Sequence, residues 1–291
     1  MTDPKPSYHP SPSKPKLKLP AGACDTHFHV FGPRARFPFP EVRTYTPADA
    51  PKEKLFELHR HLGIERGVVV QAGSHGFNNS AAADLIGSGG GNYVGVALVK
   101  TSASDEDLRK LDRQGFRAAR FHYMSHLGKP EPIEDIMALA NRLAGIGWHL
   151  QMHMQPPHIA ALSPALSRSP VPVVVDHMGR IDAAKGIGDE GFQSLLKLME
   201  HKHVWVKVSG CERASKQPAP WRDALPFAAK LVAEFGERTL WGTDWPHPNL
   251  AEIPDDGALV DALAEIAPSE AQRRTLLVDN PARFYFQRRM T

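Results

Sequence analysis

The sequence has only two cysteines in 291 residues, Cys24 and Cys211. They lie far apart and match no CxxC or multi-cysteine zinc pattern, which excludes a disulfide framework or a cysteine zinc site as the basis of the fold. Such sparse thiols are typical of the reducing cytoplasm, where we expect this protein to reside. Cys211 has no predicted base partner, so we expect a buried thiol rather than a nucleophile.

Long apolar runs and a strong charge of one sign are also missing. No apolar run approaches the roughly 18 residues that a membrane span requires. Residues 1–20 are rich in Pro and Lys and lack the apolar core of a secretory signal. The net charge is only +3, and the Lys and Arg residues are spread along the chain. We therefore expect a small-molecule ligand, no nucleic-acid or membrane partner, and a monomer or small homo-oligomer.

From about residue 21 onward, short β-rich runs alternate with longer helical patterns, which is typical of repeated βα units around a parallel sheet. Runs such as VPVVVD are continuously apolar, as expected of strands covered on both faces. The expected strands are Gly22–Phe28, Gly67–Gln71, Tyr93–Leu98, Ala118–Phe121, Trp148–His153, Val173–Asp176, Val204–Val208 and Leu240–Gly242. The expected helices lie near 51–63, 79–87, 104–114, 131–145, 156–167, 188–201, 222–236 and 269–278.

Eight βα units predict an α/β fold of the (β/α)₈ TIM-barrel type. An open doubly wound sheet is disfavoured because no Gly-rich phosphate loop follows the first strand. We expect one barrel domain over residues 21–288, preceded by an extended, flexible arm over residues 1–20 that lies outside the fold.

Polar residues occur at nearly every expected strand end, where the active sites of such barrels lie. His27 and His29 are two residues apart at the end of the first strand, and therefore on the same face of an extended chain. His177 follows the sixth strand, and Asp244 follows the eighth. A single barrel histidine is more often a packing residue, but this coincidence of four strand ends favours an active site.

Other histidines and aromatic residues have simpler interpretations. His59 falls within an expected helix and His201 flanks a helix end, so we expect surface positions for both. Trp241 and Trp245 bracket Asp244, and we expect them to pack the barrel rim.

The motifs at the strand ends resemble those of the amidohydrolase superfamily, in particular amidohydrolase-related family 2. They are the HxH of the first strand, D-H-M-G-R after the sixth and W-G-T-D-W-P-H-P at the eighth. With C-D-T-H-F-H-V-F-G-P, R-F at the fourth strand and I-P-D-D-G, the chain is similar to the 2-pyrone-4,6-dicarboxylate hydrolases from about Ala21 to Phe286. This resemblance implies a lactonase that reversibly hydrolyses a small anionic cyclic ester in the catabolism of aromatic or related acids.

The resemblance also implies roles for individual residues. Asp244 corresponds to the general base that activates water, and His27, His29 and His177 to the residues that polarise the lactone carbonyl. The residues expected to bind the substrate and its carboxylates are Arg120, Arg180, Arg213 and Tyr45, to which we add His75, His122 and His126 from the strand-end loops.

His126 departs from the family pattern, because it stands where those hydrolases carry a second arginine after the fourth strand. Imidazole lacks the bidentate fork of arginine and is not always charged near neutral pH. Other substrates and reactions therefore stay open: a muconolactone, a sulfonated muconolactone or a sugar-acid lactone, lactone isomerisation, or a metal-dependent decarboxylation of the same superfamily.

His153 is the second departure, because it replaces a tyrosine of that family at the end of the fifth strand. The resemblance implies metal-free operation, whereas metal-using amidohydrolases carry a histidine on strand five or six. One divalent ion, Zn²⁺ rather than Mn²⁺, therefore remains an alternative. Its expected ligands would come from His27, His29, His153, His177 and Asp244.

Overall fold

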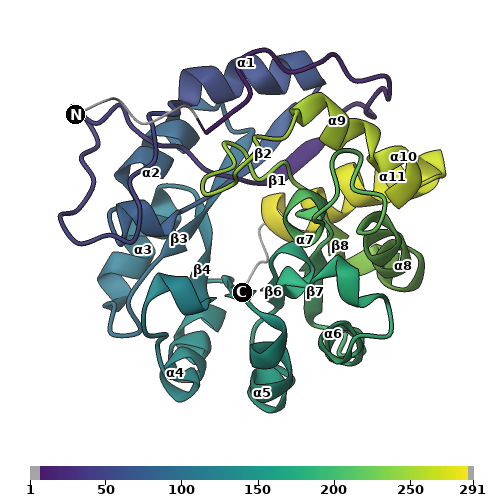
Figure 1. Ribbon diagram of the computed structural model, residues 1–291. Helices are drawn as coiled ribbons and strands as arrows, with labels where there is room; N and C mark the ends of the chain where they lie inside the picture. The colour runs from purple at the N-terminus through teal and green to yellow at the C-terminus, as the bar shows by residue number, and fades with distance from the viewer. Residues whose placement is uncertain (1–6, 288–291) are drawn as a thin grey trace.

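A computed structural model describes residues 7–287, and its eight parallel strands pair in sequence order. The strands are β1 (Cys24–Phe28), β2 (Arg66–Val70), β3 (Tyr93–Leu98), β4 (Phe116–Tyr123), β5 (His149–Met154), β6 (Val173–Val175), β7 (Val204–Lys207) and β8 (Thr239–Leu240). Figure 1 shows the strands gathered at the centre with the helices outside them. The prediction of a (β/α)₈ barrel is confirmed.

Each expected helix is present in the outer layer. The α-helices are α1 (Lys52–Leu62), α2 (Ser80–Ser88), α3 (Asp105–Arg113), α4 (Ile133–Ala144), α5 (Pro156–Leu166), α6 (Glu190–Met199), α7 (Cys211–Ala214), α8 (Leu225–Phe235), α9 (Asp256–Asp261), α10 (Leu263–Ile266) and α11 (Glu270–Arg274). The short helices α7, α9 and α10 were not predicted. A capping box between Ser104 and Asp107 begins α3, and Gly63, with a φ of 82°, ends α1 in the left-handed conformation.

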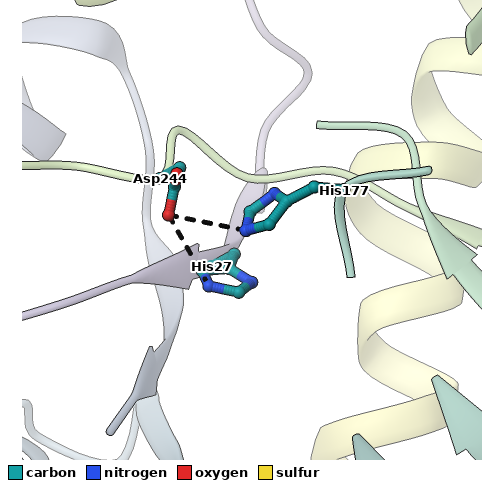
Figure 2. Close-up of side chains that lie close together, drawn as sticks. All are labelled: His27, His177 and Asp244. Atoms are coloured by element: carbon teal, nitrogen blue, oxygen red, sulfur yellow. Dashed lines mark ion pairs between the residues drawn. The ribbon is translucent and has the colours of Figure 1, made fainter. Parts of the chain in front are cut away.

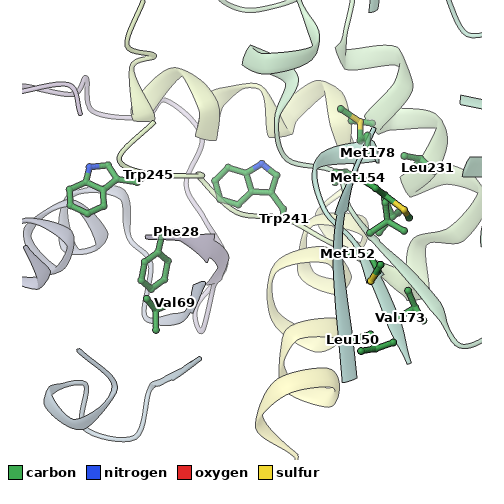
Figure 3. Packing of buried hydrophobic residues seen from close by; sticks show 14 of the residues in the cluster. Phe28, Val69, Leu150, Met152, Met154, Val173, Met178, Leu231, Trp241 and Trp245 are labelled. Atoms are coloured by element: carbon green, nitrogen blue, oxygen red, sulfur yellow. The ribbon is translucent and has the colours of Figure 1, made fainter. Parts of the chain in front are cut away.

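The side chains of the strands separate into an outer and an inner set, as the two-residue period of a strand requires. The outward set, which includes Val69 and Val173, packs against the helices (Figure 3). The inward-facing side chains at one end of the barrel are apolar, and residues of the C-terminal segment pack against them. This apolar cluster contains Cys24, Val68, Val70, Val94, Val96, Ala118, Val174, Trp205, Leu240, Phe284 and Tyr285. Arg120, Asp176 and Lys207 continue the inward faces of their strands above this layer, and all three are buried. The barrel interior is thus apolar at one end and charged at the other.

The inward position of the His27 side chain depends on an irregularity in β1. Its register against β2 shifts between Asp25 and Phe28. A bulge changes which residues face inward, so that Cys24 and His27, an odd number of positions apart, both reach the interior.

Backbone hydrogen bonds close the barrel between β1 and the segment that follows β8. Thr26 N donates to Trp241 O at 2.9 Å, Asp244 N to His27 O at 2.7 Å, and His29 N to Trp245 O at 2.7 Å. These main-chain hydrogen bonds between β1 and the segment after β8 therefore fix the histidine pair and the aspartate relative to each other.

The buried Asp25 carboxylate strengthens the same closure. It accepts hydrogen bonds from His27 N at 2.9 Å, from Thr243 N at 3.1 Å and from Thr243 Oγ1 at 2.6 Å. β1 and the segment after β8, which are distant in sequence, share this one acceptor, so they are held in a fixed register.

The N-terminal segment contains no helix or strand over residues 7–20, yet it lies against the barrel. Ser13 N donates to Asp255 Oδ1 at 2.9 Å, and the Tyr8 ring lies 5.4 Å from that of Trp245. This part of the chain thus differs from the expected arm outside the fold. Residues 1–6 of that arm, and residue 288 of the expected domain, lie outside the described residues. Within residues 7–287, no helix has the length and apolar character needed to cross a membrane.

The closure allows no side chain at Gly242. A Cβ atom there would lie 2.4 Å from His27 N and 2.6 Å from Asp25 Oδ1. We predict that Gly242→Ala lowers the free energy of unfolding by about 1–3 kcal/mol, the usual cost of overpacking, in denaturant titrations. Gly87→Ala is the matched control, because a Cβ there meets no atom within 4 Å. Equal stabilities of the two variants would contradict this account of the closure.

Candidate active site

Three histidine rings surround one oxygen of the Asp244 carboxylate. The Nε2 atoms of His27, His29 and His177 lie 3.7, 3.3 and 3.6 Å from Asp244 Oδ1. Figure 2 shows His27 and His177 pointing at the carboxylate from separate elements. The rings of His27 and His29 are 5.1 Å apart, so the HxH pair does share a face. The four residues that the strand-end pattern singled out therefore form one buried cluster.

Left-handed backbone conformations orient two members of this cluster. Asp244 has a φ of 60°, and His177 and Met178 in the turn after β6 have φ values of 49° and 52°. Residues other than glycine rarely adopt such angles, and where they persist the surrounding structure holds them in place. The carboxylate and the imidazole thus face each other because both turns are constrained.

Hydrogen bonds on the far side of two rings hold them in place. His29 Nδ1 lies 2.7 Å from Val70 O, which only accepts, so Nδ1 donates and Nε2 faces Asp244. His177 Nδ1 contacts Ser209 Oγ at 3.0 Å. Burial lowers the pKa of His177 to about 3 and the pKa of His27 well below its usual value, so both rings are neutral at physiological pH.

Asp244 is ionised despite its burial. Desolvation opposes ionisation, but the Arg213 guanidinium and the His177 ring hold the pKa of the carboxyl well below its usual range. Arg213 Nε donates to Asp244 Oδ2 in a short contact, and Arg213 Nη1 donates to Pro248 O at 3.3 Å. Arg213 was expected to hold a substrate carboxylate, but here it pairs with the candidate base.

A cavity of about 320 Å³ opens above the cluster. It is lined by His29, Tyr45, Ala72, Gly73, Arg120, His122, His126, Leu127, His153, His177, Arg180, Arg213, Asp244, Pro248, Asn249 and Leu250. Arg180 has no hydrogen bond or ion pair within residues 7–287, although burial lowers its pKa only to about 10 and it stays charged. Burial also raises the pKa of Tyr45, which is therefore a neutral phenol. The cavity thus presents a cation without a direct hydrogen-bond partner, beside an ionised carboxylate.

Comparison with known proteins assigns the chain to a family. The amidohydrolase family model, Amidohydro_2, matches residues 24–287. The chain belongs to the amidohydrolase family. Its four clustered residues come from the strand ends that carry the motifs of that resemblance.

This amidohydrolase is 47% identical over 289 residues to a 2-pyrone-4,6-dicarboxylate hydrolase of Comamonas testosteroni, with 96% of this chain and 95% of the relative covered. It is 35% identical to a 4-sulfomuconolactone hydrolase of Hydrogenophaga intermedia, covering 97% and 94% of the two chains. A crystal structure from Acinetobacter baumannii, described as a "probable 2-pyrone-4,6-dicarboxylic acid hydrolase" with citric acid bound, superposes with a TM-score of 0.83 at 26% identity. That alignment covers 91% of this chain and 100% of the other.

Of two further expected site residues, His75 lies outside the cavity and His153 lies in its lining. His75 does not line the cavity, because its ring is packed 4.5 Å from that of Phe39, where burial lowers its pKa to about 4. His153 lines the cavity, but its Nδ1 faces His122 Nδ1 at 3.2 Å and it is outside the set of closely grouped metal-ligand atoms. The role of His153 as a metal ligand therefore stays a prediction.

The predictions for His59 and Cys211 were also tested by the amidohydrolase structure. His59 was expected on the surface but is buried, with Nε2 3.4 Å from Asp25 Oδ2 and Nδ1 2.9 Å from Tyr93 Oη. The surface prediction is wrong because α1 turns this face of the helix toward the barrel. The Cys211 thiol is buried, and burial raises its pKa, as expected for an unreactive cysteine.

A second layer of charge beneath the cluster was missed by the sequence reasoning. Arg120 Nε donates to Asp176 Oδ2 at 3.0 Å, so this expected substrate residue is partly engaged within the barrel. Lys207 is fully buried below His27, and burial lowers its pKa to about 8. The signal was present, because a lysine within the apolar run V-W-V-K-V must be compensated inside the barrel.

The amidohydrolase cluster fits one divalent ion. His27, His177 and Asp244 each offer one ligand atom, and these atoms lie within 4.8 Å of one another. His27 Nε2 is buried and has no hydrogen-bond partner in the described chain, as a ligand atom facing a cation would be. Imidazole and carboxylate are donors that suit Zn²⁺.

The ion pair with Arg213 is predicted to control the protonation of Asp244. In Arg213→Met the carboxylate loses its cationic partner, so its pKa rises and the acid limb of the pH dependence of kcat/KM moves to higher pH. The pH profile of the variant should show this shift, whereas Arg274→Met, which removes an exposed arginine, should leave the limb in place. An unchanged acid limb in Arg213→Met would exclude this role for Arg213.

Proposed function

We propose that this amidohydrolase is a lactonase that opens a small anionic lactone similar to 2-pyrone-4,6-dicarboxylate, with Asp244 as the general base. The observation that carries this proposal is the ionised Asp244 carboxylate at the floor of a cavity that also holds the unpaired Arg180 guanidinium. The 47% identical relative from Comamonas testosteroni carries that hydrolase name.

The cavity suits a small, negatively charged ring. Its volume of about 320 Å³ is near the lower limit of small-molecule sites. Arg180 is free to pair with a substrate carboxylate, and Arg120 also lines the cavity. No lining residue other than Asp244 carries a carboxylate. An anionic lactone would therefore meet the Arg180 cation and no carboxylate other than the base.

The proposed chemistry is addition of water to the lactone carbonyl. Asp244 accepts a proton as the water oxygen bonds to the carbonyl carbon, and the histidines stabilise the oxygen that gains negative charge. The ring C–O bond then breaks, and its oxygen takes the proton from Asp244 to give the open acid and restore the carboxylate. Binding of a substrate carboxylate gives Arg213 a second anionic partner, which weakens its hold on Asp244 and makes the base stronger.

A divalent ion, with Zn²⁺ favoured, would be held by His27, His177 and Asp244. When bound, such an ion polarises the carbonyl and lowers the pKa of a bound water. Metal-free operation stays as the alternative, because the neutral His177 ring and the ionised aspartate already provide a polar group and a base in the cavity.

A sulfonated muconolactone is the second candidate substrate. His126 lines the cavity at the position where 2-pyrone-4,6-dicarboxylate hydrolases carry a second arginine. Binding of one of the two substrate carboxylates is therefore expected to be weaker here. The relative that is 35% identical is a 4-sulfomuconolactone hydrolase. Parallel kinetics with the dicarboxylate and the sulfonated lactone would decide between them through the ratio of kcat/KM values.

Asp244→Asn tests the base. We predict at least about a 100-fold loss of kcat, because the amide cannot accept the proton, with retained binding of an unreactive dicarboxylate. Proton release on ring opening measures turnover, and calorimetry measures binding. Asp182→Asn, an exposed aspartate outside the cavity, is the control. Near-normal kcat in Asp244→Asn would contradict the assignment, and release of carbon dioxide by the wild type would indicate a decarboxylase.

Arg180→Met tests the anion site. Hydrogen bonds to charged groups contribute about 1.5–3 kcal/mol, so KM for the dicarboxylate lactone should rise about 10–100-fold. KM for an uncharged lactone should stay unchanged, and Arg168→Met should behave as the wild type because Arg168 is exposed. An equal effect on charged and uncharged lactones would show that Arg180 does not bind the substrate anion.

A further inference from the structure

Lys207 is fully buried in the centre of the barrel, and its ammonium group lies directly below His27. Its Nζ donates to Thr26 O at 2.8 Å and to Gln151 Oε1 at 3.0 Å. An ammonium group has three protons to donate. These two neutral acceptors therefore account for two of them.

The third proton has two candidate acceptors. His27 Nδ1 lies 3.2 Å from Nζ, within hydrogen-bond distance, whereas Asp176 Oδ1 lies 3.6 Å away. Asp176 Oδ1 is also 3.3 Å from His27 Nδ1, yet it accepts no hydrogen bond within the described residues. The geometry therefore favours donation from Lys207 to the imidazole.

We infer that Lys207 is a positioning residue that keeps the ring proton of His27 on Nε2. A neutral imidazole that accepts at Nδ1 must carry its proton at Nε2. That nitrogen faces Asp244 Oδ1 at 3.7 Å, on the buried side of the aspartate that lines the substrate cavity. His27 then directs an N–H toward Asp244, the proposed general base. This catalytic use rests on the proposed lactonase activity, whereas the tautomer does not.

The same proton opposes metal binding by His27. A metal ligand must offer a lone pair, and an Nε2–H cannot. In Lys207→Met the ammonium is lost, and His27 Nδ1 regains a proton that it donates to Asp176 Oδ1, only 3.3 Å away. Nε2 then carries the lone pair and points toward His177 and Asp244. Lys207 and Asp176 thus compete to make His27 either a hydrogen-bond donor or a metal ligand.

Nitrogen-15 NMR of the full chain, labelled at histidine, tests the tautomer without any substrate. His27 of the wild type should show a protonated Nε2 and an unprotonated Nδ1, and Lys207→Met should reverse the two. A wild-type His27 protonated at Nδ1 would overturn the inference even if the variant failed to fold.

Zn²⁺ affinity and kinetics supply the independent readouts. In Lys207→Met, Zn²⁺ should bind about 10–100-fold more tightly in competition with a chelating dye, the range typical of residues that orient metal ligands. The variant's kcat for the lactone should fall about 10–100-fold with little change in KM, because the N–H that faces the general base Asp244 is lost. Lys185→Met, which removes an exposed lysine, should change neither quantity.

Unchanged Zn²⁺ affinity and kcat in a folded Lys207→Met variant would also overturn the inference. A protein that turns over no lactone but shows the predicted His27 tautomer would instead refute the proposed function and leave the role of Lys207 intact.

Discussion

The ionised carboxylate of Asp244 is the group on which the arrangement of this barrel end depends. A charge buried this deeply is unfavourable unless hydrogen bonds and opposite charge compensate for its lost hydration. Arg213 supplies the charge and the histidines supply polar contacts, and they come from the ends of β1, β6 and β7. The need to stabilise one carboxylate therefore brings four strand ends together.

Buried charged residues beneath the cluster of His27, His29, His177 and Asp244 hold that cluster in place. Asp25 joins β1 to the segment after β8, so the histidine pair and Asp244 keep a fixed separation. Asp176, Arg120 and Lys207 form a buried network of alternating sign directly beneath His27. Because all of these groups are desolvated, a change in any one of them alters the protonation or hydrogen bonding of its neighbours.

Much of this structure could be predicted from the sequence, because the fold repeats one pattern. Apolar runs such as VPVVVD identify the strands, and each polar residue at a strand end falls near the active site by geometry alone. His27, His29, His177 and Asp244 were found in this way. The site residues that were predicted wrongly are those whose positions depend on contacts formed only in the folded chain. The packing of His75 against Phe39 arises from a loop contact that no periodicity encodes.

Pairing between side chains was the other part that the sequence could not provide. Arg213 was expected at the substrate, but only the folded chain shows that its guanidinium meets Asp244. His59 was expected on the surface because its helix pattern does not identify Asp25 as a buried partner. Lys207 is an intermediate case, since its position in an apolar strand indicates burial but not the contact with His27.

The central claim is that Asp244 activates a water molecule that becomes part of the product. Turnover of the lactone in water enriched in oxygen-18, followed by mass spectrometry of the ring-opened acid, tests this most directly. A hydrolase places one labelled oxygen in the newly formed carboxylate in a single turnover. A product without label, as an isomerase would give, or a product that has lost carbon dioxide, would contradict the account.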